Sequence, residues 1–209
     1  MNKLILLRHG QSQWNLENRF TGWKDVPLTD QGKEEAKKAG QLLKKNNVKI
    51  DVVFSSVLQR ANKTAEITLK QTSLEHLWTG ENLNMINHES LNERDYGDLV
   101  GLNKKETAEK FGKEQVHIWR RSYDTPPPNG ESLKDVVERV GPYYEQNIQP
   151  LINEKKNVII VAHGNSLRAT MIQVGLYKPE DISKIEIPTG NPFCIVFTDN
   201  KLEDSFYLN

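Results

Sequence analysis

Two short runs of apolar residues, one at the start of the chain and one in its second half, each end at a histidine followed by a glycine. Lys3–Leu7 leads into Arg8-His9-Gly10, and Asn157–Ala162 leads into His163-Gly164-Asn165-Ser166. Nearly continuous apolar runs of this length are typical of strands that are buried on both faces, as in a parallel sheet. We therefore expect two buried strands, each presenting a histidine at its carboxyl end.

In open α/β sheets, ligands bind outside the carboxyl ends of the strands, so His9 and His163 are expected to converge on one pocket. Arg8 makes an anion the natural ligand, and a phosphoryl group needs arginines and fixed N–H donors. A neutral imidazole is a competent nucleophile, and nearby arginines disfavour its protonated form. Gly10 is expected to adopt a positive φ and to let backbone amides approach the ligand.

The rest of the chain alternates helical and strand patterns, which predicts an α/β fold with a mainly parallel central sheet flanked by helices on both faces. We expect residues 1–209 to form one catalytic domain. The expected helices begin after caps at Thr29, Ser56, Asn103 and Ser132, and after a cap at either Asn165 or Ser166. The further expected strands cover residues 51–55, 83–88, 185–187, 194–198 and 206–208.

Composition excludes several classes of function. The chain has 28 basic and 28 acidic residues, so its net charge offers no argument for binding nucleic acid or a membrane. Its one cysteine, Cys194, rules out an intrachain disulfide and fits a reducing compartment, and no apolar run is long enough to span a membrane. We therefore expect a cytoplasmic protein. His76, His88 and His117 show no metal-ligand spacing, and no metal is expected.

Arg8-His9-Gly10 together with Ala162–Ser166 resembles the histidine phosphatase superfamily. Leu91–Gly97 and Gly101–Lys104 resemble, more narrowly, its 2,3-bisphosphoglycerate-dependent phosphoglycerate mutase branch. The resemblance implies a phosphoglycerate mutase-like fold and interconversion of 2- and 3-phosphoglycerate in glycolysis and gluconeogenesis. It also implies 2,3-bisphosphoglycerate as the primer of a phosphohistidine, small-molecule phosphoglycerates as the only partners, and no metal. A homo-oligomer is one option that the sequence leaves open.

Carried over residue by residue, the resemblance makes His9 the phosphoryl-accepting nucleophile and Glu93 the general acid/base. Arg8, Arg60 and His163 would hold the transferring phosphoryl group, forming one anion site. Lys104, Arg120 and Arg121 would form a second anion site for the other end of the substrate. The implied substrate-binding set also includes Ser12, Asn15, Thr21, Gly22, Tyr96, Gly164 and Asn165, with Arg8, Arg60 and Glu93 serving both purposes.

Two alternatives to a mutase stay open. A phosphomonoesterase would use the same phosphohistidine and pass the phosphoryl group to water, and a catalytically inactive chain would only bind phosphate. The proline run at Pro126–Pro128 reaches Gly130 at once, where many relatives carry a longer insertion, and the chain ends soon after its last strand. We therefore expect a more open pocket than in long-form relatives, and faster loss of the phosphoryl group to water.

Overall fold

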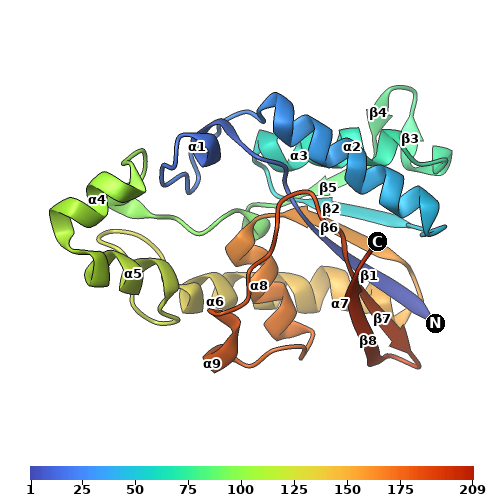
Figure 1. Cartoon of the computed structure of the whole chain (residues 1–209). Coiled ribbons are helices and arrows are strands. Elements are labelled where there is room, and N and C mark those ends of the chain that lie inside the picture. Colours follow the sequence, from blue (N-terminus) through green and yellow to red (C-terminus); the bar gives the residue numbers. More distant parts are fainter.

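The computed structural model describes residues 1–209 and is built around a six-stranded sheet with strand order β5-β2-β6-β1-β7-β8 (Figure 1). The first three pairings in this order are parallel and the last two are antiparallel, which confirms the prediction of a mainly parallel sheet. The strands are β1 (Asn2–Arg8), β2 (Val52–Ser55), β5 (Met85–Asn87), β6 (Val158–Ala162), β7 (Phe193–Thr198) and β8 (Lys201–Tyr207).

Helices cover both faces of the sheet because the strand residues alternate between two cores. Ile5 and Leu7 of β1 pack toward α2 (Asp30–Lys45) and α3 (Gln59–Lys70), on one face. Leu4 and Leu6 pack toward α6 (Leu133–Tyr143) and α8 (Gly164–Gln173), on the other. All four side chains are fully buried, so β1 is the doubly buried strand that its apolar run predicts.

The two strand–histidine units are direct neighbours in the sheet. Strands β1 and β6 run parallel, with Arg8 opposite Ala162. The backbone N–H of His9 donates to the carbonyl of Ala162 over 3.0 Å, which continues the ladder past the end of β1. The parallel register therefore places His9 and His163 at the same edge, as predicted.

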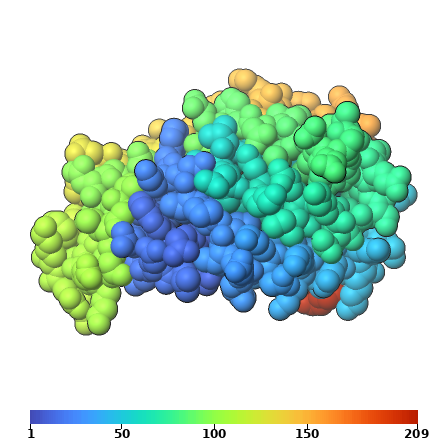
Figure 2. All heavy atoms as spheres, turned by 90° about the horizontal axis from the view of Figure 1, so that it is seen from above, coloured from blue at the N-terminus to red at the C-terminus, as the bar shows by residue number.

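Helices α1 (Gln13–Leu16), α4 (Lys104–Phe111) and α5 (Lys113–Arg121) lie beyond that edge (Figure 1). In Figure 2, α4 and α5 form a lobe at one end of the molecule, next to the loop that follows β1. The other helices are α7 (Gln149–Asn153) and α9 (Pro179–Ile182), and a π-helical turn (Tyr144–Ile148) joins α6 to α7. The strands β3 (Trp78–Thr79) and β4 (Asn82–Leu83) form a small separate hairpin. Three 3-10 turns cover Glu75–Leu77, Glu89–Leu91 and Gly97–Leu99.

Several predicted boundaries are wrong. Residues 185–187 form no strand, because the carbonyls of Ile185 and Ile187 accept hydrogen bonds from Arg168 and Arg8 rather than from a neighbouring strand. Helix α3 begins at Gln59, three residues after the predicted cap at Ser56. Helix α8 begins at Gly164, with His163 as its cap, so neither Asn165 nor Ser166 caps it.

Gly10 is required for a different reason from the one predicted. Its φ is not positive, but its backbone lies directly against Gly32 in helix α2. A Cβ atom at Gly10 would lie 2.1 Å from the carbonyl oxygen of Gly32, far inside van der Waals contact. The glycine therefore allows α2 to approach the turn that carries His9.

None of the helices is both long enough and apolar enough to cross a membrane. No three side chains among the histidines, cysteines, aspartates and glutamates are grouped so that they could hold a metal ion.

Candidate active site

His9 is held by a hydrogen bond that defines which ring nitrogen carries its proton. Its Nδ1 lies 2.7 Å from the carbonyl oxygen of Gly10, which can only accept, so Nδ1 carries the proton in the neutral ring. Nε2 consequently keeps its lone pair. His9 also lines a pocket, although only 2% of its surface is exposed. An unprotonated Nε2 in a pocket is the arrangement that a nucleophilic histidine needs.

The surroundings keep this ring neutral. Burial, followed by the positive charges of Arg60 and Arg8, lowers the pKa of His9 well below its usual range, and the Gly10 carbonyl opposes this only in part. Burial also lowers the pKa of Arg60, to about 10, so the guanidinium stays charged at neutral pH. The sequence-based expectation of a neutral histidine among arginines agrees with this electrostatic arrangement.

His163 lies beneath His9 rather than on the wall of the pocket. The two ring centroids are 5.0 Å apart, and His163 is fully buried. Its Nε2 lies 2.7 Å from the hydroxyl of Ser56, which follows strand β2. Burial and the charge of Arg60, the two largest causes, lower the pKa of His163 well below its usual range. His163 is therefore a second neutral imidazole, and the hydroxyl of Ser56 fixes its ring through Nε2.

We call the cavity above His9 the histidine pocket. It is formed by residues from the loop after β1, from the start of α3, from the segment that follows β5 and from the start of α4. Its lining is Arg8, His9, Asn15, Arg19, Thr21, Gly22, Arg60, Glu93, Tyr96 and Lys104. Arg60 donates to the carbonyls of Gly22 and Lys24 over 2.8 and 2.9 Å, and thereby fixes the loop that carries Thr21 and Gly22.

Glu93 is the one carboxylate in the histidine pocket. Its Oε1 accepts from the backbone N–H of Arg94 (2.8 Å) and from both the backbone and side-chain amides of Asn165 (3.1 and 3.0 Å). Burial raises the pKa of Glu93, but these bonds and the charges of Arg8 and Arg60 outweigh burial and lower it. The side chain is thus ionised in the free protein, with one oxygen bound and Oε2 left over for a ligand.

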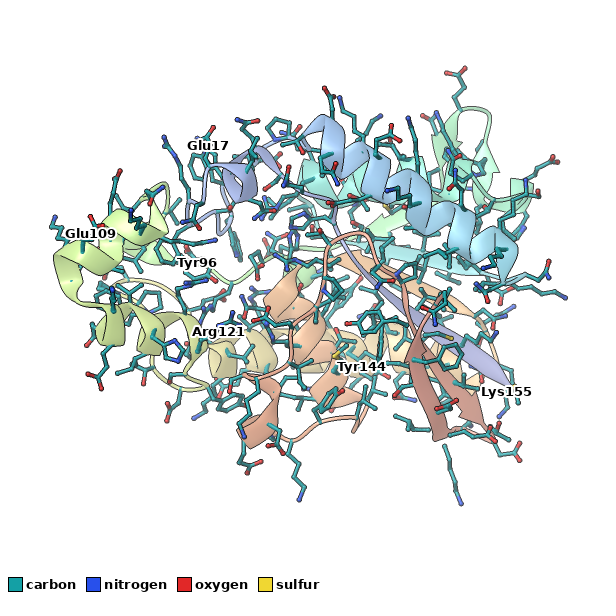
Figure 3. All side chains as sticks on the ribbon, in the orientation of Figure 1. Glu17, Tyr96, Glu109, Arg121, Tyr144 and Lys155 are labelled. Carbon is teal, nitrogen blue, oxygen red and sulfur yellow. The ribbon has the colours of Figure 1, made fainter.

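A second basic cavity, which we call the arginine pocket, adjoins the first through Asn165. Figure 3 shows Arg121 at the end of α5 and Tyr96 nearby, both between the α4–α5 lobe and the rest of the molecule. Arg121 is paired with the carboxylate of Glu186 over 2.5 Å, and Arg168 lies 3.8 Å from the same carboxylate. The lining is Arg94, Arg120, Arg121, Ser122, Leu133, Asn165, Arg168 and Ser183.

The three residues predicted to form the second anion site line two different pockets. Lys104 lines the histidine pocket, where its ammonium lies 5.8 Å from the centre of the Phe20 ring, whereas Arg120 and Arg121 line the arginine pocket. Two other predicted residues support the site without lining either pocket. Ser12 caps α1, with its hydroxyl accepting from Asn15, and Gly164 packs near the guanidinium of Arg8.

Sequence reasoning missed four residues of this site. Arg19 lines the histidine pocket, while Arg94 and Arg168 line the arginine pocket. Ser56 bonds His163, although its sequence position suggested only a helix cap. Arg19 and Arg94 lie in segments without a strand–histidine pattern, and Arg168 lies in the helix that follows the second unit. Nothing in their local sequence distinguishes the three from surface arginines.

Comparison with known proteins assigns the family. Residues 4–204 match the family model described as histidine phosphatase superfamily, branch 1. The chain belongs to the histidine phosphatase superfamily. The match spans both strand–histidine units of this chain.

Two curated relatives narrow the assignment within the superfamily. A protein of Parvibaculum lavamentivorans is 50% identical over 95% of this chain and 91% of its own length, and one of Mesorhizobium japonicum is 52% identical over 90% and 89%. Both are named 2,3-bisphosphoglycerate-dependent phosphoglycerate mutase. Among solved structures, a mycobacterial glucosyl-3-phosphoglycerate phosphatase aligns with a TM-score of 0.78 at 24% identity, over 94% of this chain and 93% of its own. This structural similarity extends the shared fold to nearly the whole chain.

Proposed function

We propose that this chain is a 2,3-bisphosphoglycerate-dependent phosphoglycerate mutase, acting in the cytoplasm as one catalytic domain and interconverting 2- and 3-phosphoglycerate. The observation that carries the proposal is the state of His9: its Nδ1–H is bonded to the Gly10 carbonyl and its Nε2 is unprotonated, in a pocket lined by three arginines and the Glu93 carboxylate. The names of relatives that are half identical to this chain support the same substrate.

In the proposed cycle, phospho-His9 first donates to the free hydroxyl of a monophosphoglycerate. Glu93 takes the hydroxyl proton while the new O–P bond forms and the N–P bond breaks, since its lowered pKa keeps it ionised and able to accept a proton. The product turns over in the pocket. His9 Nε2 then attacks the other phosphoryl group, and Glu93 returns its proton to the departing oxygen. Arg8 and Arg60 stabilise the charge on the transferring phosphoryl group in both steps.

The donor groups of the site fit a ligand with several negative charges. Nε of Arg8, Nε of Arg60, and both Nε and Nη1 of Arg94 are buried N–H donors without a partner in the protein. Buried donors of this kind are costly unless an acceptor satisfies them, and phosphate oxygens are strong acceptors. When bound, 2,3-bisphosphoglycerate supplies the phosphoryl group that primes His9.

A bisphosphoglycerate also has an anionic group at each end, and the two adjoining basic pockets match this. We propose that Arg8, Arg60 and Lys104 bind the phosphoryl group above His9. Arg120 and Arg121, with Asn165, would bind the far end of the substrate in the arginine pocket, where Glu186 now pairs with Arg121. His163 would support the ring of His9 from below as a neutral neighbour.

One assay tests the proposal: conversion of 3-phosphoglycerate with and without added 2,3-bisphosphoglycerate, in the presence of a chelator, for the wild type and His9→Ala. We expect conversion that depends on the bisphosphoglycerate, persists in chelator and is lost in His9→Ala. Release of inorganic phosphate without isomerisation would identify a phosphomonoesterase instead. Absence of acid-labile phosphate on the protein would leave only a phosphate-binding role.

A further inference from the structure

The segment that carries Glu93 lacks regular secondary structure of its own. It joins the 3-10 turn Glu89–Leu91 to the 3-10 turn Gly97–Leu99, so no strand or helix fixes the residues between them. The position of the Glu93 carboxylate therefore depends on the amides that bind its Oε1 and on what binds the backbone of this segment. Side chains from two distant elements provide those bonds.

Arg139, in the middle of α6, is the first of them. Its Nη1 donates to the carbonyl of Ser90 over 2.8 Å, and its Nη2 donates to the carbonyls of Asn92 and Glu93 over 3.1 and 2.9 Å. The guanidinium is itself held by Glu131 through Nε (2.7 Å) and Nη2 (3.0 Å). Because a guanidinium is a rigid planar fork, this set of bonds fixes three carbonyls relative to α6.

Trp23 approaches the same carbonyl from the other side. It follows Gly22 in the loop that lines the histidine pocket, and its indole Nε1–H donates to the carbonyl of Glu93 over 2.6 Å. The guanidinium of Arg139 lies 5.6 Å from the centre of the Trp23 ring, so the two side chains also contact each other as a cation and an aromatic face. The peptide oxygen of Glu93 therefore has two donors from two separate parts of the chain.

Neither side chain lines the histidine pocket or the arginine pocket, so neither has a direct role in binding the substrate. A single buried hydrogen bond to a loop carbonyl would be an ordinary structural contact. Here two donors converge on the peptide oxygen of Glu93, the residue that supplies the one carboxylate of the histidine pocket. Arg139 also binds the carbonyls of Ser90 and Asn92. We propose that Trp23 and Arg139 are a pair of positioning residues that together hold the Glu93 carboxylate at the substrate hydroxyl.

The inference rests on the proposed function, in which Glu93 moves the proton of the substrate hydroxyl. Displacing a catalytic group by about 1 Å can cost on the order of 100-fold in rate. In variants of Trp23 or Arg139, the rate should fall only in those steps in which Glu93 accepts or returns the proton of the substrate hydroxyl. Phosphorylation of His9 by p-nitrophenyl phosphate does not need it, because p-nitrophenolate leaves without a proton. The initial burst of p-nitrophenolate therefore reports on the rest of the pocket, independently of Glu93.

The first variant is Trp23→Phe, which keeps an aromatic ring and removes only the N–H donor. We expect kcat for 3-phosphoglycerate to fall about tenfold, with KM changed by less than about twofold and the p-nitrophenolate burst unchanged. Trp78→Phe is the matched control, since Trp78 lies in the β3–β4 hairpin away from both pockets, and it should behave as the wild type.

The second variant, Arg139→Lys, keeps the charge but cannot bind three carbonyls and Glu131 at once. We expect a loss in kcat on the order of 100-fold, again with the burst retained. Lys134→Gln, an exposed substitution on the same helix, is its control. Because both donors act on one peptide oxygen, the double variant Trp23→Phe/Arg139→Lys should lose less than the product of the two single losses.

Two results would overturn the inference. Wild-type kcat in Trp23→Phe would show that its bond does not position Glu93. A parallel fall of mutase turnover and burst in both variants would indicate a general disturbance of the pocket. A wild type without mutase activity would overturn the proposed function and this inference with it, whereas an active wild type with unaffected variants would overturn this inference alone.

Discussion

His9 and His163 occupy equivalent places in two strand–histidine–glycine units, yet their hydrogen bonds differ. His9 is held through Nδ1 by a backbone carbonyl of its own turn and lines the histidine pocket. His163 is bound through Nε2 by Ser56 and lies beneath the pocket. Both rings are buried, both have a lowered pKa, and their centroids are 5.0 Å apart.

The comparison teaches that burial and charge keep both rings neutral, whereas hydrogen bonding and access to the pocket distinguish them. A backbone carbonyl can only accept, so it fixes the proton of His9 on Nδ1 and leaves Nε2 free in a ring that lines the pocket. Ser56 occupies Nε2 of His163, and its Nδ1 is buried without a partner in a ring that does not line the pocket. The proposed division of labour, with His9 as nucleophile and His163 as its support, follows from these two differences.

The largest expected effect is the loss of mutase turnover when the imidazole ring of His9 or of His163 is removed. We expect His9→Ala to lower mutase turnover by a factor on the order of 10⁴ or more, because the nucleophile is lost. His163→Ala should lower it about 10²- to 10³-fold, because a supporting group is lost. His117→Ala, which removes an exposed histidine, is the control. A loss for His163→Ala as great as that for His9→Ala would remove the distinction between the two rings.

Gly10 and Gly164 give the next test, because each directly follows the histidine at a strand end but the two have different surroundings. A Cβ at Gly10 would meet the backbone of Gly32 at 2.1 Å, whereas a Cβ at Gly164 has no neighbour closer than 3.7 Å. We expect Gly10→Ala to lower the free energy of unfolding by about 3 kcal/mol. Gly164→Ala should change it by less than about 0.5 kcal/mol. Urea unfolding measures both, and equal losses would contradict the account.

Ser56→Ala tests the bond that distinguishes His163. We expect kcat to fall about tenfold, because His163 loses the partner that fixes its ring. Ser55→Ala is a matched control: its hydroxyl is also buried and bonded, but to the carbonyl of Val161 rather than to a site residue. Both variants should lose about 1 kcal/mol of stability. Only Ser56→Ala should lose activity, and an equal loss in both would count against the role of the bond.

The last test concerns the pH dependence of stability, in which the two rings should behave alike. Their folded-state pKa values lie below 6.5, so the unfolded chain binds more protons as the pH falls below about 6.5, and stability must fall with it. We expect His163→Gln to lose less stability than the wild type between pH 7 and pH 5, by about 1 kcal/mol per pH unit. Urea unfolding in phosphate-free buffers measures this. Identical slopes would show that His163 is not held neutral.

The sequence was sufficient to predict the meeting of the two histidines, because parallel strands that both end at a histidine bring those residues to one edge. It could not predict that Lys104 and Arg121 separate, since that depends on how α4 and α5 pack against the sheet. The strand predicted at residues 185–187 was wrong for a similar reason. Its carbonyls accept from Arg8 and Arg168, two side chains that are distant in sequence.

The two positioning residues also could not be predicted from local sequence patterns. Trp23 and Arg139 are 116 residues apart, and each bonds a carbonyl of Glu93, which has no sequence signature. The ends of the two histidine-bearing strands, and the helix caps at Thr29, Asn103 and Ser132, could be predicted from neighbouring residues. Contacts that cross from one loop or helix to another could not.

The most direct test of the central claim is to locate the phosphoryl group after incubation with 2,3-bisphosphoglycerate. Peptide mapping under alkaline conditions identifies the residue, and phosphorus NMR of the denatured protein distinguishes the two ring nitrogens. The account predicts a single phosphohistidine at His9, linked through Nε2. A phosphoryl group on His163, or on Nδ1 of His9, would contradict it.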